Sequence, residues 1–465
     1  MTINLKSLRS LFLLWGLLLL SGPSLFATNV IDTISHLDWD GVEVRWVEDQ
    51  RLPVYTIAIY FADGAISDAS NRKGETSTMF DLLESGTRRY SQQEISDHLD
   101  FYAAARSGNV NHEYASYTVS GLIKDLVPTM KKVCHLFADS IFPKHEVKKV
   151  IKKQVANLRS MINSKGALAN RAFRQLSLKG SPFDYPAEGK IGDLPRINQR
   201  GLKKRLDYFN RSVKKRIYLF GPKKVLAFKD IVKHDCRWKG EGANFVRQID
   251  YSPVKASGKG APIYLITVPD ANQAQVRVGR FLNRNQDANR PLMSLASGFL
   301  GGGFTSKLNR EVRVKRGLTY SISSFASMQK EYGRAAIMTS TRNDRVVELL
   351  QVVRDVIKQV GQGEYPAEEF LKAQGHLAGG NAFRFEQGEG LVSQLLFFDH
   401  VGTPYRHLVE FPAKVEGLNA QQMNQTIKDL FAWSKQTIVV LGSAALRKEL
   451  KKLGNVKVIP YKRFL

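Results

Sequence analysis

The sequence predicts an α+β fold built twice from one plan. The evidence is an internal repeat in which short apolar segments recur at a nearly constant offset. VYTIAIYFADG matches QAQVRVGRFLNR, PTMKKVCHLFADSIFPKHEVKKVIKKQ matches RVVELLQVVRDVIKQVGQGEYPAEEFLKAQ, and VKKRIYLFGPKK matches KQTIVVLGSAA. The offsets are 220, 223 and 221, counted between Phe61 and Phe281, Pro143 and Pro366, and Gly221 and Gly442. Because these offsets agree so closely over 200 positions, we interpret the chain as a duplication.

Each half mixes alternating strands with amphipathic helices, which is the pattern of an α+β domain. The first half opens with strands from about Val42 to Phe61, and both halves close with a helix after a glycine turn. Lys239 to Pro262 is rich in Gly, Ser and Pro, with KGEG and KASGKGAP at its ends, as expected of a linker. We therefore predict domains at 28–238 and 263–465, joined by a linker at 239–262.

The first 27 residues have the pattern of a secretory signal peptide. Lys6 and Arg9 precede the apolar run Leu11 to Leu20, and SGPSLFA ends in a small residue at Ala27. The run is shorter than the roughly 20 residues needed to span a bilayer. We expect cleavage near Ala27 and an exported product, periplasmic or secreted, with no stable membrane span after signal removal.

Two cysteines, Cys134 and Cys236, are too few and too far apart for a disulfide framework or a CxxC metal site. We expect both to be buried free thiols, with a single disulfide as the alternative in an oxidising compartment.

The net charge of +26 implies anionic partners. Lysine doublets at 148–149, 152–153, 203–204 and 214–215 are typical of a solvated basic face. No nucleic acid is expected as a partner, because the basic clusters lack the interleaved aromatic residues of a stacking platform. An acidic peptide, an acidic subunit or an anionic membrane surface is a better match to an exported protein.

The second half contains GGGFTSKLNREVRVKRGLTYSISS, from Gly301 to Ser324, and this segment resembles the pitrilysin/insulinase (M16) family of metallopeptidases. In that family a glycine-rich turn is followed by an Arg and a Tyr seven residues apart, which here are Arg313 and Tyr320. The resemblance implies that these two residues, with Gly301, Gly302 and Gly303, hold a substrate peptide and its reacting carbonyl. A guanidinium donates in a fork geometry to carbonyl oxygens, and a phenol can stabilise a developing oxyanion.

The same resemblance calls for an HxxEH zinc motif in the first half, where two His bind zinc and Glu activates water. GETSTMFDLLESGT, from Gly74 to Thr87, matches the frame of that motif but not its chemistry. Ser77 and Asp81 occupy the His positions, Phe80 occupies the Glu position, and the third ligand falls near Asn157. A rescued oxygen-ligand site with Asp81 or Glu84 is the alternative, although such a site lacks imidazole and a base.

The resemblance implies two tandem homologous domains of the LuxS/metallohydrolase type, each an antiparallel-rich sheet packed by helices. It also implies a non-catalytic subunit without cofactor, whose zinc-bearing partner carries HxxEH and whose substrate is a peptide. A homodimer is expected if no such partner exists. The alternatives are a stand-alone binding or scaffold protein of the same descent, and a cationic protein that binds anionic lipid or nucleic acid.

Overall fold

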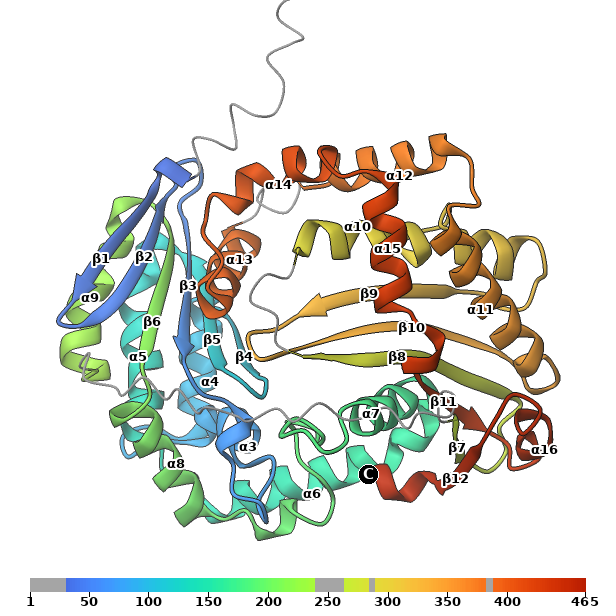
Figure 1. Cartoon of the computed structure of the whole chain (residues 1–465). Helices are drawn as coiled ribbons and strands as arrows, with labels where there is room; N and C mark the ends of the chain where they lie inside the picture. The colour runs from blue at the N-terminus through green and yellow to red at the C-terminus, as the bar shows by residue number, and fades with distance from the viewer. Residues whose placement is uncertain (1–30, 239–262, 284–288, 382–387) are drawn as a thin grey trace, which may run out of the picture.

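The computed structural model describes residues 31–238, 263–283, 289–381 and 388–465. The predicted signal peptide and the predicted linker lie outside the described residues. Within these ranges, the helices are too short or too polar to cross a bilayer. Figure 1 shows two sheets with their helices, one at each side of the molecule.

Six strands of the first half form one mixed sheet in the order β1-β2-β6-β3-β5-β4. All neighbours are antiparallel except β2 and β6, which are parallel. The strands are β1 Ile34–Trp39, β2 Val42–Glu48, β3 Val54–Phe61, β4 Ala105–Val110, β5 Ala115–Leu122 and β6 Lys215–Gly221.

The second half forms another six-stranded sheet, in the order β12-β7-β11-β8-β10-β9. Its strands are β7 Ile263–Thr267, β8 Gln273–Asn283, β9 Ile322–Met328, β10 Tyr332–Arg342, β11 Thr437–Gly442 and β12 Val456–Pro460. Five of its strands occupy the same sheet positions as strands of the first sheet. For example, β8 has the position that β3 has in the first sheet. The remaining edge differs, because β1 pairs antiparallel with β2 whereas β12 pairs parallel with β7. The α+β prediction is thus confirmed, with antiparallel pairs dominating both sheets.

The helices of the first half follow the same plan as those of the second. The first set is α3 Glu75–Asp81, α4 Gln92–Phe101, α5 Leu126–Asp139, α6 Lys144–Ser160, α7 Lys165–Ser177, α8 Gln199–Arg211 and α9 Phe228–Ile231. The second set is α10 Arg290–Gly301, α11 Val346–Gln362, α12 Ala367–Gly379, α13 Gly388–Val401, α14 His407–Glu416, α15 Ala420–Leu430 and α16 Leu446–Leu450. Pro143 and Pro366 immediately precede α6 and α12, which places the helix starts where the repeat predicts them.

Each half covers the other half's sheet with one helix. Helix α7 packs on β8 and β11 of the second sheet, and α13 packs on β3 and β6 of the first sheet (Figure 1). The two helices end at Ser177 and Val401, which are 224 residues apart, so the exchange follows the repeat. The contact between α7 and the second sheet is tightly packed, because a Cβ added to Gly279 of β8 would lie 2.7 Å from the ring of Phe173 on α7.

The exchange explains why β3 reads as a continuous apolar run and not as an alternating one. Ile57, Ile59 and Phe61 point into the core beneath the first half's own helices. Ala58 and Tyr60 point to the opposite face and pack against α13. A strand that is buried on both faces loses the alternation of a half-solvated strand.

The two cysteines are joined, so the expectation of free thiols is wrong. Cys134 on α5 and Cys236 form a disulfide across a separation of 102 residues, with their Cα atoms 4.4 Å apart. The sequence separation alone did not reveal this pairing, because the segment after α9 folds back onto α5.

Candidate functional site

The predicted Arg and Tyr lie in the connection between α10 and the edge strand β9. Arg313 is in a π-helical segment, Asn309–Val314, and Tyr320 precedes β9 by two residues. Buried Asn309 holds this connection closed, since its side-chain amide donates to the carbonyl oxygens of Gly303 and Ile322, each at 2.9 Å. The glycine turn and the start of β9 are thereby fixed beside the segment that carries Arg313.

Arg313 lies between two aromatic rings. Its guanidinium carbon is 5.1 Å from the ring centroid of Tyr320 and 4.9 Å from that of Phe304. A guanidinium over an aromatic face is attracted by the ring quadrupole, so this stacking holds the side chain without neutralising it. The structure therefore brings the predicted pair together and adds Phe304, which the sequence reasoning missed.

Arg313 forms no ion pair in the part of the chain that the structure describes. Its neighbours differ, because Arg310 pairs with Glu369 and Arg316 pairs with Glu311 at 2.8 Å. The donors of Arg313 are accordingly available to an external acceptor.

The surroundings of Arg313 are unusually exposed for large side chains. The exposed fractions are 85% for Tyr320, 78% for Phe304 and 72% for Val314. A contiguous group of exposed apolar and aromatic residues is typical of a binding surface. We call Phe304, Arg313, Val314 and Tyr320 the arginine patch.

The three glycines do not all serve one purpose. A Cβ on Gly301 would lie 2.6 Å from the backbone nitrogen of Ser324 in β9, and one on Gly302 would lie 2.6 Å from the Cα of Gly298. Gly301 and Gly302 thus allow close packing inside the protein, whereas Gly303 faces open space. That all three glycines let a peptide approach the backbone closely stays a prediction. This geometry supports it only for Gly303.

The positions of the zinc motif lie on two helices in contact, α3 and α6. Ser77, Phe80 and Asp81 are on α3, and Asn157 is on α6. Gln154 of α6 joins the helices, because its amide donates to the Asp81 carboxylate at 2.9 Å and its carbonyl accepts from Thr78 at 3.2 Å. A hydrogen-bonded amide therefore connects the helices beside the zinc-motif positions.

These residues do not match the requirements of zinc. Phe80, at the position of the catalytic Glu, is buried among Phe61, Phe137 and Phe209 with ring centroids 5.9 to 6.3 Å away. The four motif positions Ser77, Phe80, Asp81 and Asn157 supply one carboxylate and no imidazole or thiolate. Among the residues with described positions, no cluster of three His, Cys, Asp or Glu could hold a metal ion. Gln154 was missed by the sequence reasoning, which considered only the frame positions themselves.

Comparisons with known proteins agree with this picture. Residues 227–377, which include the arginine patch, match the family described as Peptidase M16 inactive domain. An uncharacterised zinc protease of Streptomyces coelicolor is 23% identical over 73% of this chain and 74% of its own length. The non-peptidase homolog YmxG of Helicobacter pylori is 20% identical over 83% of this chain and 88% of its own length.

The fold is also found among solved structures. A peptidase M16 inactive domain from Pseudomonas fluorescens superimposes with a TM-score of 0.77 and 20% identity, over 88% of this chain and 98% of that one. The chain is thus similar to inactive members of the M16 family, through a family model over residues 227–377 and through relatives and a fold that extend over most of its length. The motif positions lack both imidazoles and the catalytic Glu, which agrees with the description of the matching family model as an inactive domain.

Proposed function

We propose that this chain is the non-catalytic, peptide-binding subunit of an exported zinc-peptidase complex. In this proposal an M16 partner with an HxxEH motif supplies zinc and the general base. This chain supplies Arg313 and Tyr320, which bind the peptide and stabilise the charge that develops on its reacting carbonyl.

The observation that carries the proposal is the state of Arg313. Its guanidinium is stacked between two rings, has no acidic partner among the described residues and lies within an exposed patch. A side chain that serves stability alone gains from an ion pair, as Arg310 and Arg316 do. Arg and Tyr are also the residue types that dominate binding hot spots.

The adjoining strand offers a path for the peptide. Strand β9 is the outer strand of its sheet, and in the described part of the chain it pairs only with β10. An extended peptide can add to such an edge through main-chain hydrogen bonds. A peptide bound there would pass Tyr320 at the start of the strand.

The disulfide supports the exported location. Structural disulfides persist in oxidising compartments and are rare in the cytosol. The Cys134–Cys236 bond is therefore in keeping with the secretory pattern of residues 1–27.

The test is reconstitution with an HxxEH-bearing M16 protein from the same source. Cleavage of a fluorogenic peptide is measured for the partner alone and for the mixture, with the wild-type chain, Arg313→Ala, Tyr320→Phe or Arg316→Ala. We expect the wild-type chain to accelerate cleavage, and each of the first two substitutions to reduce that acceleration by roughly 10²-fold or more, as when an oxyanion donor is lost.

Arg316→Ala is the matched control, because Arg316 is in the same segment but is paired with Glu311. It should leave the acceleration intact. The shared-site proposal is refuted if the mixture is no faster than the partner alone, or if the Arg313 and Arg316 variants behave alike.

A stand-alone scaffold of M16 descent is the second candidate, and the exposed rings of the arginine patch favour it as well. Phe304 and Tyr320 could be buried against a permanent protein partner without any proteolysis. In that case Phe304→Ala would abolish complex formation in a pull-down, while peptide cleavage would not depend on this chain.

A further inference from the structure

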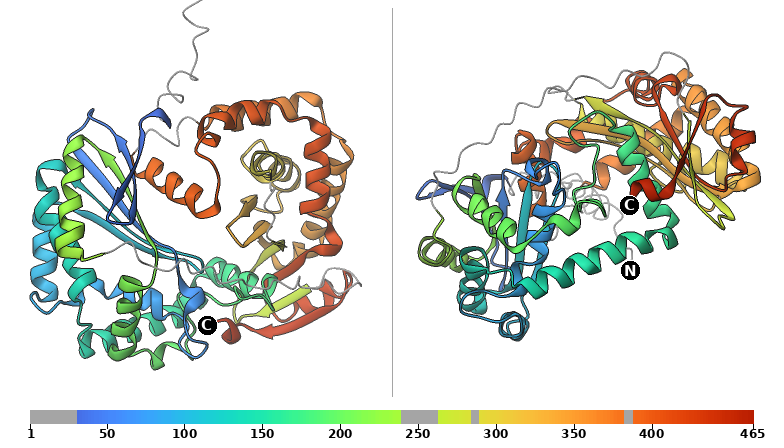
Figure 2. Two further views of the ribbon diagram at one scale, coloured as in Figure 1. Left: turned by 60° about the vertical axis from the view of Figure 1, so that its left-hand side comes forward. Right: turned by 90° about the horizontal axis from the view of Figure 1, so that it is seen from below.

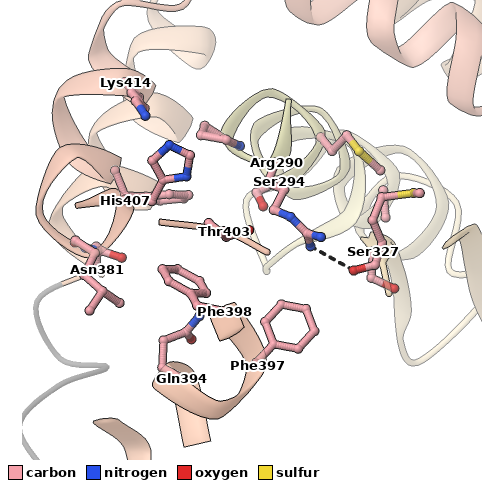
Figure 3. Close-up of a pocket in the computed structure, with 16 residues that line it drawn as sticks. Arg290, Ser294, Ser327, Asn381, Gln394, Phe397, Phe398, Thr403, His407 and Lys414 are labelled. Atoms are coloured by element: carbon pink, nitrogen blue, oxygen red, sulfur yellow. Dashed lines mark hydrogen bonds between the residues drawn. The ribbon is translucent and has the colours of Figure 1, made fainter. Parts of the chain in front are cut away.

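A second candidate site lies at the far end of β9 from Tyr320. It is a pocket of about 240 Å³ between the first turn of α10, the end of β9, and helices α13 and α14 (Figure 3). Helix α10 contacts α14, whereas α13 packs on the first sheet, so the pocket lies where the two halves meet (Figure 2). The wall formed by β9 consists of Ala326, Ser327 and Met328.

The pocket is positively charged. None of its 16 lining residues is acidic, and three are basic: Arg290, His407 and Lys414. Lys414 is paired with Glu410 at 2.8 Å outside the pocket lining. Burial, and next the charge of Lys414, lowers the pKa of His407, so its ring is neutral near pH 7. Arg290 is thus the cation that a ligand would meet.

The partners of Arg290 among the described residues carry no negative charge. One terminal nitrogen donates to the carbonyl oxygen of Met328 at 2.8 Å, and its guanidinium carbon is 5.3 Å from the ring centroid of Phe397. No carboxylate pairs with it among the described residues. Figure 3 shows its side chain extending into the pocket, with Phe397 and Phe398 along another wall. Arg290 is partly buried, and this burial lowers the pKa of its guanidinium.

The rest of the lining combines uncharged polar residues, among them Ser294 and Gln394, with apolar ones. The large apolar side chains are Phe397, Phe398, Phe411 and Met293. The volume is below the roughly 300–1,000 Å³ of sites for drug-sized ligands. It therefore suits one large side chain next to an anionic group.

We propose that this pocket binds the carboxyl-terminal residue of a peptide whose last side chain is aromatic or large and aliphatic. The carboxylate lies against Arg290, which can donate to it in a charge-assisted fork, and the side chain packs on Phe397 and Phe398. The choice of a peptide over a free acid rests on the proposed peptide-binding function, because β9 runs from Tyr320 to the pocket. A chain paired with β9 can place its last residue there.

The test uses calorimetric titration of the full-length chain without any partner. The probes are N-acetylphenylalanine, its neutral amide, N-acetylglycine, and a hexapeptide that ends in phenylalanine with a free carboxylate. We expect the free acid to bind at least about tenfold more tightly than the amide, given the strength of hydrogen bonds between charged groups. N-acetylglycine should not bind, and the hexapeptide should bind about tenfold more tightly than N-acetylphenylalanine.

Two variants and one control are matched to the pocket. Arg290→Gln should weaken binding of the acid at least about tenfold, and Ser294→Leu, which fills the pocket, should abolish binding of acid and amide. Arg280→Gln is the control, because Arg280 is also half-buried and donates to a backbone carbonyl at 2.9 Å, but outside the pocket. Unchanged far-ultraviolet circular dichroism and thermal midpoints confirm that the variants are folded.

The outcomes separate this inference from the proposed function. Equal affinity for acid and amide, or an equal effect of the Arg280 and Arg290 variants, overturns the pocket as a carboxylate site. Equal affinity for N-acetylphenylalanine and the hexapeptide overturns the peptide as its ligand. Arg313→Ala should leave N-acetylphenylalanine binding unchanged, so failure of reconstitution with a partner does not affect this result.

Discussion

Replacing Glu113 with alanine should loosen the joint between the two halves of the chain. Glu113 is in the turn between β4 and β5, and its carboxylate accepts from the backbone nitrogens of Lys330 at 3.1 Å and Glu331 at 2.8 Å. Those two residues are in the turn between β9 and β10. That turn is the counterpart, in the second half, of the β4–β5 turn that carries Glu113. His400 of α13 lies 2.9 Å from the same carboxylate.

The magnitude follows from burial. The side chains of Glu113 and His400 are only 6% and 2% exposed. Removing this carboxylate leaves its hydrogen-bonding partners without an acceptor, which costs about 1–3 kcal/mol for a buried site. We expect Glu113→Ala to lower the free energy of unfolding by that amount. Glu113→Gln should cost less, because its amide oxygen still accepts from one backbone nitrogen.

The assay is urea unfolding followed by circular dichroism, with Glu364→Ala as the control at an exposed position. Substitutions at exposed positions without buried contacts usually change the free energy of unfolding by no more than about 0.5 kcal/mol. If Glu113→Ala is no more destabilising than Glu364→Ala, the reasoning that this carboxylate joins the halves is refuted.

Three further predictions concern other parts of the molecule. Replacing Cys134 and Cys236 by serine should reduce stability by about 4–5 kcal/mol, the value for a closed loop of roughly 100 residues; a matching drop on adding reductant to the wild type would confirm it, and equal urea midpoints would contradict it. Gly301→Ala should cost about 1–3 kcal/mol through overpacking against β9, whereas Gly303→Ala should be nearly neutral in the same assay. Burial pushes the pKa of Glu43 up, but the adjacent lysine and arginine outweigh it and hold the pKa at about 2. Because this folded-state pKa is below the ordinary 4.5, the carboxylate stabilises the fold above pH 4.5 and loses that effect as the pH falls toward 2. Replacing Glu43 by glutamine should therefore remove on the order of 2 kcal/mol at pH 7 and flatten the stability profile between those pH values; parallel profiles for mutant and wild type would disprove this.

The sequence predicted the duplicated sheets because strand and helix order is a local property that recurs with the repeat. It also predicted that Arg313 and Tyr320 lie together, from a spacing shared with a family. Phe304 could not be predicted from spacing, because its ring reaches Arg313 through the path of the glycine turn. The same is true of Gln154, whose partners are on another helix.

The exchange of α7 and α13 and the Cys134–Cys236 disulfide were both missed from the sequence, and for the same physical reason. The apolar face of α7 shows that the helix is buried, but not which sheet buries it, and the same holds for α13. Likewise the cysteine pair depends on how the segment after α9 returns to α5. Pairings over long sequence separations are set by the whole fold, and single-residue patterns do not encode them.

The exchange of α7 and α13 has a consequence for the order of events during synthesis. The face of the first sheet formed by Ala58, Tyr60, Tyr218 and Phe220 receives its cover from residues 388–401. Chains fold from the N-terminus as they emerge, so this apolar face is bare until most of the polypeptide has appeared. We expect a nascent chain stopped before residue 388 to be bound by holdase chaperones and degraded by added protease, and one released after residue 416 to resist both.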